Sequence, residues 1–150
     1  MKVFRFSKAK YCFDLSGIGA SFYPGRWNRS GRKIIYSAGS RALALVEITV
    51  HLPSGIIPKD YFLIDLLIPD DSIKIITLSD LPTNWKSKDD ITKDIGDSFI
   101  AENKYLVLSV PSVIVPFEQN YLINPNHIKM QEVAIISSAI FDIDPRLYGF

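Results

Sequence analysis

Residue types suited to binding phosphate are concentrated in one stretch, from Gly17 to Glu47, which reads GIGASFYPGRWNRSGRKIIYSAGSRALALVE. Its glycines let the backbone turn sharply and approach a ligand closely. Its loop arginines, Arg26, Arg29 and Arg32, present planar guanidinium groups whose geometry matches phosphate oxygens. We interpret the stretch as a nucleotide-handling site for which the rest of the chain is the scaffold.

Glu47 is the most informative single residue, because it stands between Val46 and Ile48 in a predicted helix that is apolar almost all round. A buried carboxylate is costly unless it is paired or used. Two interpretations stay open. Glu47 is either an acid that works on a ligand, or a structural carboxylate that pairs with an arginine or reaches solvent.

Arg26, taken alone, is typical of a surface loop arginine. Its neighbours favour a binding role, because Gly25 leaves the backbone open while Trp27 and Asn28 can hold the loop in place.

The other polar candidates each have a structural interpretation as well. Tyr36 is typical of a half-buried strand aromatic whose hydroxyl is hydrogen-bonded. Ser112 is typical of a bend and Asn124 of a turn, since each adjoins a proline. His51 stands at the end of the expected apolar helix, where capping of the helix C-terminus is the expected role.

Several familiar motifs are absent. Gly17-Ile18-Gly19 is half of a dinucleotide-binding fingerprint and follows no strand directly, and no P-loop motif occurs. Ser112 and His127 do not make a hydrolase pair, because no G-x-S-x-G sequence surrounds the serine.

Composition narrows the class further. The 150 residues fit one domain, residues 1–150, and 47% hydrophobic with 22% charged residues exclude a disordered chain. A net charge of +1 argues against a nucleic-acid-coating surface. Cys12 is the single cysteine and cannot form an internal disulfide, so a reducing cytoplasm is expected. One cysteine also gives no metal-ligand spacing, so no metal site is expected. No apolar run is long enough to span a membrane.

The apolar pattern predicts an α+β fold with curved mixed β-sheets and interspersed helices. Strands are expected at Lys2–Phe6, Lys33–Ser37, Tyr61–Ile68, Ile73–Leu78, Tyr105–Pro111, Val113–Phe117 and Val133–Ile143. A helix capped by Ser40 is expected to run to about Leu52 and to be buried on every side. A surface amphipathic helix is expected at Lys88–Glu102.

Two loops are also expected. The segment Tyr11–Lys33 is long but rich in aromatic residues, which predicts an ordered binding loop. Asn120–His127 has the composition of a turn-rich loop.

Together these motifs resemble the RES domain, a toxin family named for an arginine, a glutamate and a serine. The resemblance is carried by Arg5, by GRWN at Gly25 to Asn28, by IIYSA, by ALALVE and by VPSVIVPFEQNYLINPNH at Val110 to His127. It runs over nearly the whole chain in the right order. One departure is visible, because Pro24 stands where the family often has a glycine.

The resemblance implies a fold similar to ADP-ribosyltransferases and an activity that consumes NAD by phosphorolysis or hydrolysis. By motif, Glu47, Arg26 and Tyr36 are the expected catalytic residues. The expected NAD-binding residues are Arg5, Arg26, Tyr36, Ser112 and Asn124. No cofactor beyond NAD as substrate and no metal is implied, with inorganic phosphate as the optional co-substrate.

The implied protein partner is a cognate Xre-type antitoxin in a hetero-oligomer, with DNA reached only through that antitoxin and no membrane contact. Two alternatives remain at this level. One is an ADP-ribosyltransferase that modifies a cellular protein. The other is a non-catalytic module that binds a nucleotide or a partner. An RNA-cleaving toxin fits less well, because the charge is balanced and no histidine pair is placed for it.

Overall fold

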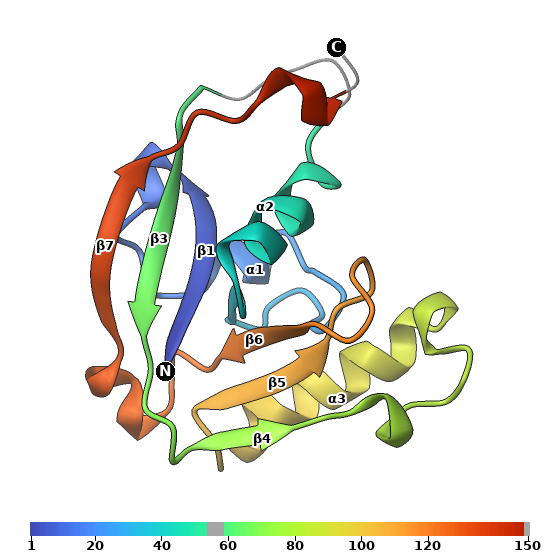
Figure 1. Ribbon diagram of the computed structural model, residues 1–150. Coiled ribbons are helices and arrows are strands. Elements are labelled where there is room, and N and C mark those ends of the chain that lie inside the picture. The colour runs from blue at the N-terminus through green and yellow to red at the C-terminus, as the bar shows by residue number, and fades with distance from the viewer. Residues whose placement is uncertain (54–58, 149–150) are drawn as a thin grey trace.

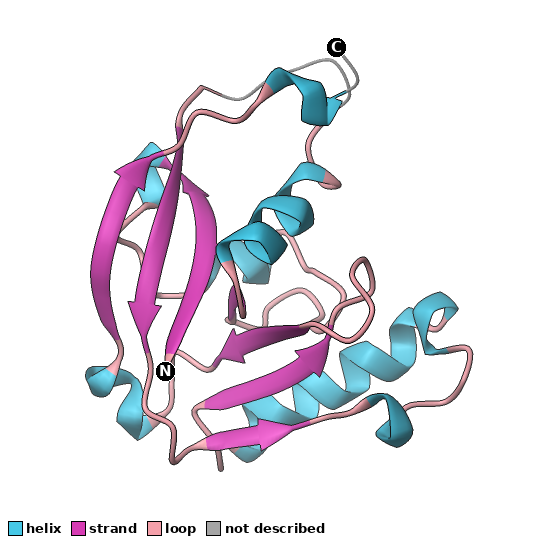
Figure 2. Cartoon of the chain, viewed as in Figure 1, coloured by secondary structure: helices cyan, strands magenta, loops and turns pink. Residues whose placement is uncertain are grey.

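The computed structural model describes residues 1–53 and 59–148, which form an α+β fold around one seven-stranded sheet (Figures 1 and 2). The strand order is β4-β5-β6-β2-β1-β3-β7. The β4–β5 pair is parallel and the others are antiparallel, so the sheet is mixed as predicted. The strands are β1 (Lys2–Lys8), β2 (Ile35–Ala38), β3 (Tyr61–Leu67), β4 (Ile73–Ile75), β5 (Val107–Pro111), β6 (Gln119–Ile123) and β7 (Ala134–Ile140).

The sheet divides between β1 and β2. Among the described residues these two strands share a single pair, Phe4 with Ala38, whereas β1 pairs with β3 from Lys2–Leu67 through to Lys8–Tyr61. In Figure 1 the group β1, β3 and β7 runs steeply, while β4, β5 and β6 run across the view. The seam borders an opening that residues of both strand groups line, among them Phe4, Tyr36 and Asn120.

Helix α2 (Arg41–Thr49) stands beside this opening, between the two strand groups (Figure 1). Its predicted N-cap is confirmed, since Ser40 Oγ accepts the backbone N–H of Leu43 at 3.0 Å. The prediction of burial on every side is wrong. Only Leu43 and Ala44 are buried, because one face of the helix borders a cavity instead of packed side chains.

The short helix α1 (Ile18–Phe22) lies inside the expected binding loop, and α3 (Asp89–Glu102) is the expected amphipathic helix. Within the described residues, no helix combines the length and apolar character needed to cross a bilayer.

Helix α3 packs on the loop that carries Arg26. Its buried residues Thr92, Gly96 and Phe99 recur at helical spacing, and Phe99 joins a core cluster that contains Trp27. Gly96 is in contact with the loop backbone, because a Cβ added there would lie 1.7 Å from the Trp27 carbonyl oxygen. The hydroxyl of Thr92 also donates to the carbonyl of Arg26 at 2.8 Å. The close packing of α3 on the loop backbone therefore holds the Arg26 loop in place.

Two sequence predictions after β5 are wrong. Residues 113–117 were expected as a strand but form bends and a turn, because Ser112 Oγ accepts the backbone N–H groups of Ile114 and Val115 at 3.1 and 3.0 Å. The next strand, β6, occupies Gln119–Ile123, within the segment expected as a loop. Its first two residues, Gln119 and Asn120, are polar, so the apolar pattern did not predict a strand there.

We predict that Gly96→Ala destabilises the protein, although Gly→Ala in an exposed helix normally stabilises by about 1 kcal/mol. The added methyl must displace the Trp27 backbone, and overpacking of this kind costs about 1–3 kcal/mol. Urea denaturation measures the change. Ser98→Ala, at an exposed position of the same helix, is the control and should leave stability equal or higher. Unchanged stability in Gly96→Ala would contradict the close packing.

Candidate active site

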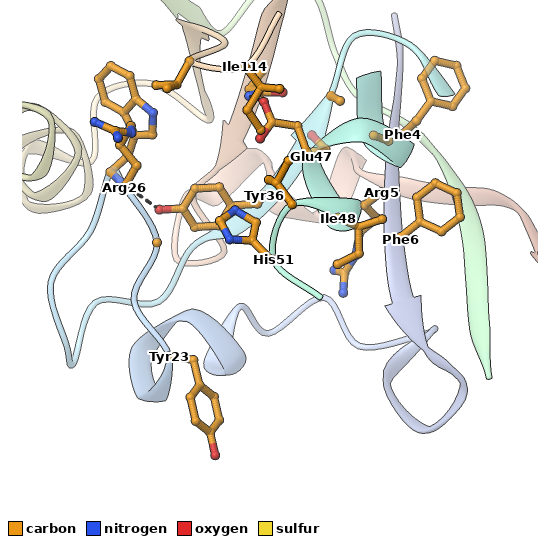
Figure 3. A pocket seen from close by; sticks show the side chains of 18 of the residues that line it. Phe4, Arg5, Phe6, Tyr23, Arg26, Tyr36, Glu47, Ile48, His51 and Ile114 are labelled. Carbon is orange, nitrogen blue, oxygen red and sulfur yellow. Dashed lines mark hydrogen bonds between the residues drawn. The ribbon is translucent and has the colours of Figure 1, made fainter. Parts of the chain in front are cut away.

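A cavity of about 550 Å³ opens at the division of the sheet (Figure 3). Four of the residues predicted from sequence line it, namely Arg5, Arg26, Tyr36 and Glu47. Its remaining walls come from β1, the loop before β2, β2, α2 and the β5–β6 region, through Phe4, Phe6, Tyr23, Pro24, Gly25, Trp27, Ser37, Ala38, Ala44, Ile48, Val50, His51, Pro111, Val113, Ile114 and Asn120. Segments far apart in the chain therefore build one site.

Glu47 is held by two donors on one oxygen. Its Oε1 accepts the Ser112 hydroxyl at 2.8 Å and the Asn120 amide at 2.6 Å. Its Oε2 has no hydrogen-bond partner among the described residues. The carboxylate is therefore fixed in orientation, with one oxygen left for a ligand. An anion fixed in a cavity wall stabilises positive charge that develops beside it.

Ser112 acts behind this carboxylate. It is buried, is not among the residues that line the cavity, and uses its hydroxyl both to donate to Glu47 and to accept the N–H groups of the following turn. The structure thus places the predicted binding serine as a support for the acid.

Asn120 was not singled out from the sequence. Its amide donates to Glu47, while its buried Oδ1 has no partner among the described residues. Leaving a buried acceptor unpaired is costly. The unpaired Oδ1 accompanies the hydrogen bond by which the Asn120 amide orients Glu47. No sequence signal pointed to Asn120, because it lies in the strand that was expected to be a loop.

Arg5 is a cation in a desolvated position. Its Nη1 donates to the Asp14 carbonyl at 3.1 Å, and it makes no ion pair with any described residue. Burial lowers the pKa of its guanidinium from the usual value, and the nearby Asp14 charge opposes part of that shift. An arginine nevertheless stays protonated at neutral pH. The cavity therefore presents a cation that makes no direct ion pair with a described residue.

Arg26 is tied to the N-terminal end of α3. Its Nη1 lies 3.0 Å from Asp89 Oδ1 and donates to the Lys86 carbonyl at 3.1 Å. In Figure 3, Arg5 and Arg26 lie on opposite sides of Tyr36 and His51. The two guanidinium groups can thus contact different parts of one extended ligand.

Tyr36 holds the Arg26 loop in place. Its hydroxyl donates to Asn28 Oδ1 at 2.7 Å. It also accepts the Trp27 N–H at 3.1 Å, the bond drawn as a dashed line in Figure 3. Its ring lies against Gly25, where an added Cβ would stand 2.7 Å from the ring. Burial raises the pKa of the Tyr36 phenol well above its usual value. The phenol is therefore a neutral donor, and the ring is open to the cavity.

Asn28 organises the same loop. It is fully buried, accepts the Gly25 N–H at 2.9 Å and donates to the Ala20 carbonyl at 2.8 Å. The expected ordering of the loop follows from this side chain and from Tyr36.

Asn124 lies apart from the cavity. Its side chain is buried, donates to Asn103 Oδ1 at 2.9 Å and accepts the Asn126 N–H at 3.0 Å. It does not line the cavity, so its position matches the turn interpretation and not the binding one.

His51 does line the cavity, which the capping interpretation did not anticipate. It lies in the turn that follows α2, two residues beyond the end of the helix at Thr49. Its imidazole makes no hydrogen bond to the last carbonyls of α2 among the described residues. The sequence pattern did not single out this position for the cavity, because His51 lies outside the helix.

A metal site is a separate question. Among the residues that the structure describes, no group of three or more His, Cys, Asp or Glu side chains is arranged to hold a metal ion.

The fold and the site define a class of protein, and comparison with known proteins gives it a name. The chain belongs to the RES domain family, which matches residues 2–144. A relative from Sphingobium sp. (strain YBL2), named Prs ADP-ribosylating toxin, is 38% identical over 89% of this chain and 86% of its own. A relative from Yersinia enterocolitica, named Toxin Res, is 36% identical over 98% of this chain and 99% of its own.

A solved structure agrees on the fold. The crystal structure of the M. tuberculosis MbcT–MbcA toxin–antitoxin complex contains a chain that superposes with a TM-score of 0.76, at 18% identity, over 99% of this chain and 86% of that chain. The family and the fold class inferred from the sequence are both confirmed.

We predict that Tyr36 makes the free energy of unfolding depend on pH in the alkaline range. Its pKa is raised in the folded state, so above the ordinary tyrosine pKa of about 10 the unfolded chain releases a proton that the folded chain keeps. The free energy of unfolding should therefore fall as pH rises through that range. Urea denaturation from pH 8 to 11 measures it. Tyr36→Phe should be less stable by about 1–3 kcal/mol at pH 8, because the Trp27 N–H loses its acceptor, and should show a weaker alkaline decline.

An equal alkaline decline in Tyr36→Phe and in the parent chain would contradict this assignment. Tyr11→Phe serves as the control, since Tyr11 is exposed and its loss should leave the pH dependence intact.

Proposed function

We propose that this chain is the toxin of a toxin–antitoxin system and that it degrades NAD by cleaving the bond between nicotinamide and ribose. The attacking group is inorganic phosphate or water. Phosphate gives ADP-ribose 1″-phosphate and nicotinamide, and water gives ADP-ribose and nicotinamide.

One observation carries the proposal. Arg5 and Glu47 line the same cavity, and neither makes an ion pair with a described residue. Both side chains are half-buried, and charges partly shielded from water gain from a partner of opposite sign. A ligand that supplies both signs is favoured, and NAD does so with its pyrophosphate and its positively charged nicotinamide ring.

Glu47 acts on the sugar. Breaking the nicotinamide–ribose bond builds positive charge on the ribose, as in glycoside cleavage. The free Oε2 of Glu47 stabilises that charge or orients a ribose hydroxyl, while Ser112 and Asn120 prevent the carboxylate from turning away.

The arginines and the tyrosine bind the rest of the molecule. Arg5 and Arg26 contact the pyrophosphate or the attacking phosphate, with the bidentate geometry that guanidinium groups favour. The ring of Tyr36 stacks on nicotinamide and holds the bond near Glu47. The leaving group is nicotinamide, which departs as a neutral molecule. No proton therefore has to be transferred to it from Tyr36.

A second candidate reaction uses the same residues with a different acceptor. The relative from Sphingobium is named an ADP-ribosylating toxin and is 38% identical to this chain. In transfer to a protein, a side chain of that protein takes the place of phosphate or water and receives the ADP-ribose.

The proposed partner is an Xre-type antitoxin that covers the cavity mouth in the cytoplasm. Its support is the fold shared with a chain of a toxin–antitoxin complex. The family resemblance also favours such a partner.

We predict that the purified chain converts NAD to nicotinamide, detected by mass spectrometry with and without phosphate. Glu47→Gln should reduce turnover by about 10²-fold or more, because it removes the stabilising charge while its amide oxygen can still accept from Ser112 and Asn120. Glu102→Gln, exposed at the end of α3, is the matched control and should keep full activity. Intact NAD under both conditions would overturn the proposal.

A labelled-NAD experiment on cell extract distinguishes the two reactions. Degradation predicts that the label stays in small molecules, and transfer predicts label on a protein band. Both signals should disappear with Glu47→Gln. A protein band that persists in the variant would be non-enzymatic and would count against transfer.

A further inference from the structure

Three groups that contact the Arg26 side chain lie in one short segment, from Trp85 to Asp89. Nη1 of Arg26 donates to the Lys86 carbonyl at 3.1 Å and lies 3.0 Å from Asp89 Oδ1. Cζ of the same guanidinium lies 6.0 Å from the centre of the Trp85 ring. The segment joins a short 3-10 helix to the first turn of α3. It therefore gives the Arg26 guanidinium a defined position before any ligand binds.

This segment is fixed to the protein core and to the Arg26 backbone. Trp85 is 4% exposed and belongs to the same core cluster as Trp27, with the two ring centres 6.1 Å apart. The Thr92 hydroxyl, which donates to the Arg26 carbonyl, also lies 2.9 Å from the Asp89 carbonyl oxygen. The beginning of α3 therefore holds both the backbone and the side chain of Arg26.

The contacts leave part of the guanidinium without a partner. Both polar contacts of the Arg26 side chain use Nη1, while Nε and Nη2 make no hydrogen bond or ion pair within the described part of the chain. Two neighbouring N–H groups of a guanidinium can bind two oxygens of one phosphate. Because Arg26 lines the cavity, the Nε and Nη2 groups are the part of the side chain that remains for a ligand.

The ion pair between Arg26 and Asp89 matters more for binding than for folding. The side chains are 27% and 58% exposed, and ion pairs at such exposure contribute little to stability. Water also screens the exposed Asp89 charge from a phosphate at the other edge of the guanidinium. A free arginine side chain, in contrast, loses much conformational entropy when a ligand fixes it. An arginine that is already fixed avoids that loss on binding.

We propose that Asp89 is a positioning residue for the phosphate-binding side chain of Arg26. Asp89 holds Nη1, so that Nε and Nη2 are directed to a phosphate group, either in the pyrophosphate of NAD or in inorganic phosphate. Asp89 is not among the residues that line the cavity, so it acts through Arg26. The inference rests on the proposed binding of phosphate groups by Arg26, and it does not require that the chain cleaves NAD.

Titrations with ADP-ribose and, separately, with inorganic phosphate test the assignment, followed by NMR so that millimolar Kd values are measurable. Asp89→Ala should weaken binding of at least one of them by about twofold to tenfold, because binding must then order the arginine. Asp90→Ala is the matched control, since Asp90 is exposed in the same helical turn but pairs with Arg29. It should bind both ligands as the parent chain does, and the two variants should share one urea midpoint.

A double-mutant cycle shows whether Asp89 acts through Arg26. In the Arg26→Ala background, Asp89→Ala should change the same Kd by less than about twofold, because the side chain that it positions is gone. A larger loss in that background would overturn the proposal. So would tighter binding by Asp89→Ala alone, since the carboxylate would then compete with the phosphate for Arg26. The proposal also fails if the parent chain binds neither ligand, or if Asp90→Ala weakens binding as much as Asp89→Ala.

Turnover shows which phosphate Arg26 binds, with nicotinamide release measured while NAD or inorganic phosphate is varied and the other is saturating. If Arg26 binds the pyrophosphate, Asp89→Ala raises the KM for NAD and keeps kcat within about twofold, because the pyrophosphate charge does not change in the reaction. If Arg26 binds the attacking phosphate, the KM for phosphate rises instead.

The two proposals fail separately. Weakened ligand binding by Asp89→Ala in a chain that releases no nicotinamide would retain the role of Asp89 and remove the reaction. Nicotinamide release with both KM values unchanged in Asp89→Ala would do the opposite.

Discussion

One carboxylate oxygen holds helix α2 to the β5–β6 part of the sheet. Glu47 stands on α2, which packs on β1, and its Oε1 receives hydrogen bonds from Ser112, just beyond β5, and Asn120, on β6. These partners are 65 and 73 residues away in the chain. The same contact that orients the acid therefore also holds α2 in place. Structure and site depend on each other at this point, which explains why a buried acceptor of Asn120 can be left without a partner.

The remainder of the site consists of groups prepared for a ligand. Arg5 is partly desolvated and makes no direct ion pair with a described residue, and the Arg26 loop is held by Tyr36, Asn28 and α3. Ordering of such groups before binding lowers the entropic cost of association. Arg26 differs from Arg5, because Asp89 already neutralises part of its charge. The cavity thus combines one unpaired cation with one partly paired cation around a fixed acid.

Much of this arrangement could be predicted from the sequence. Arg26 and Glu47 were recognisable because they stood in a glycine-rich and an apolar context, whereas Arg5 and Tyr36 were indicated by the resemblance to the RES domain. The main strands followed the apolar pattern. The β6 strand was missed because it begins with two polar residues, Gln119 and Asn120, of which Asn120 lines the cavity. Asn120 was missed with it. The role of Ser112 could not be predicted, since a serine that supports an acid and one that touches a ligand look alike in sequence.

The seam between β1 and β2 has a mechanical consequence. Because one residue pair, Phe4 with Ala38, joins these strands in the described chain, a small rotation of one strand group against the other breaks few ladder hydrogen bonds. The placement of the two strand groups therefore depends on side-chain contacts, among them the packing of α2 on β1 and the bonds of Glu47 to Ser112 and Asn120. A ligand that binds Glu47 thus binds at a point on which the assembly of the whole domain depends.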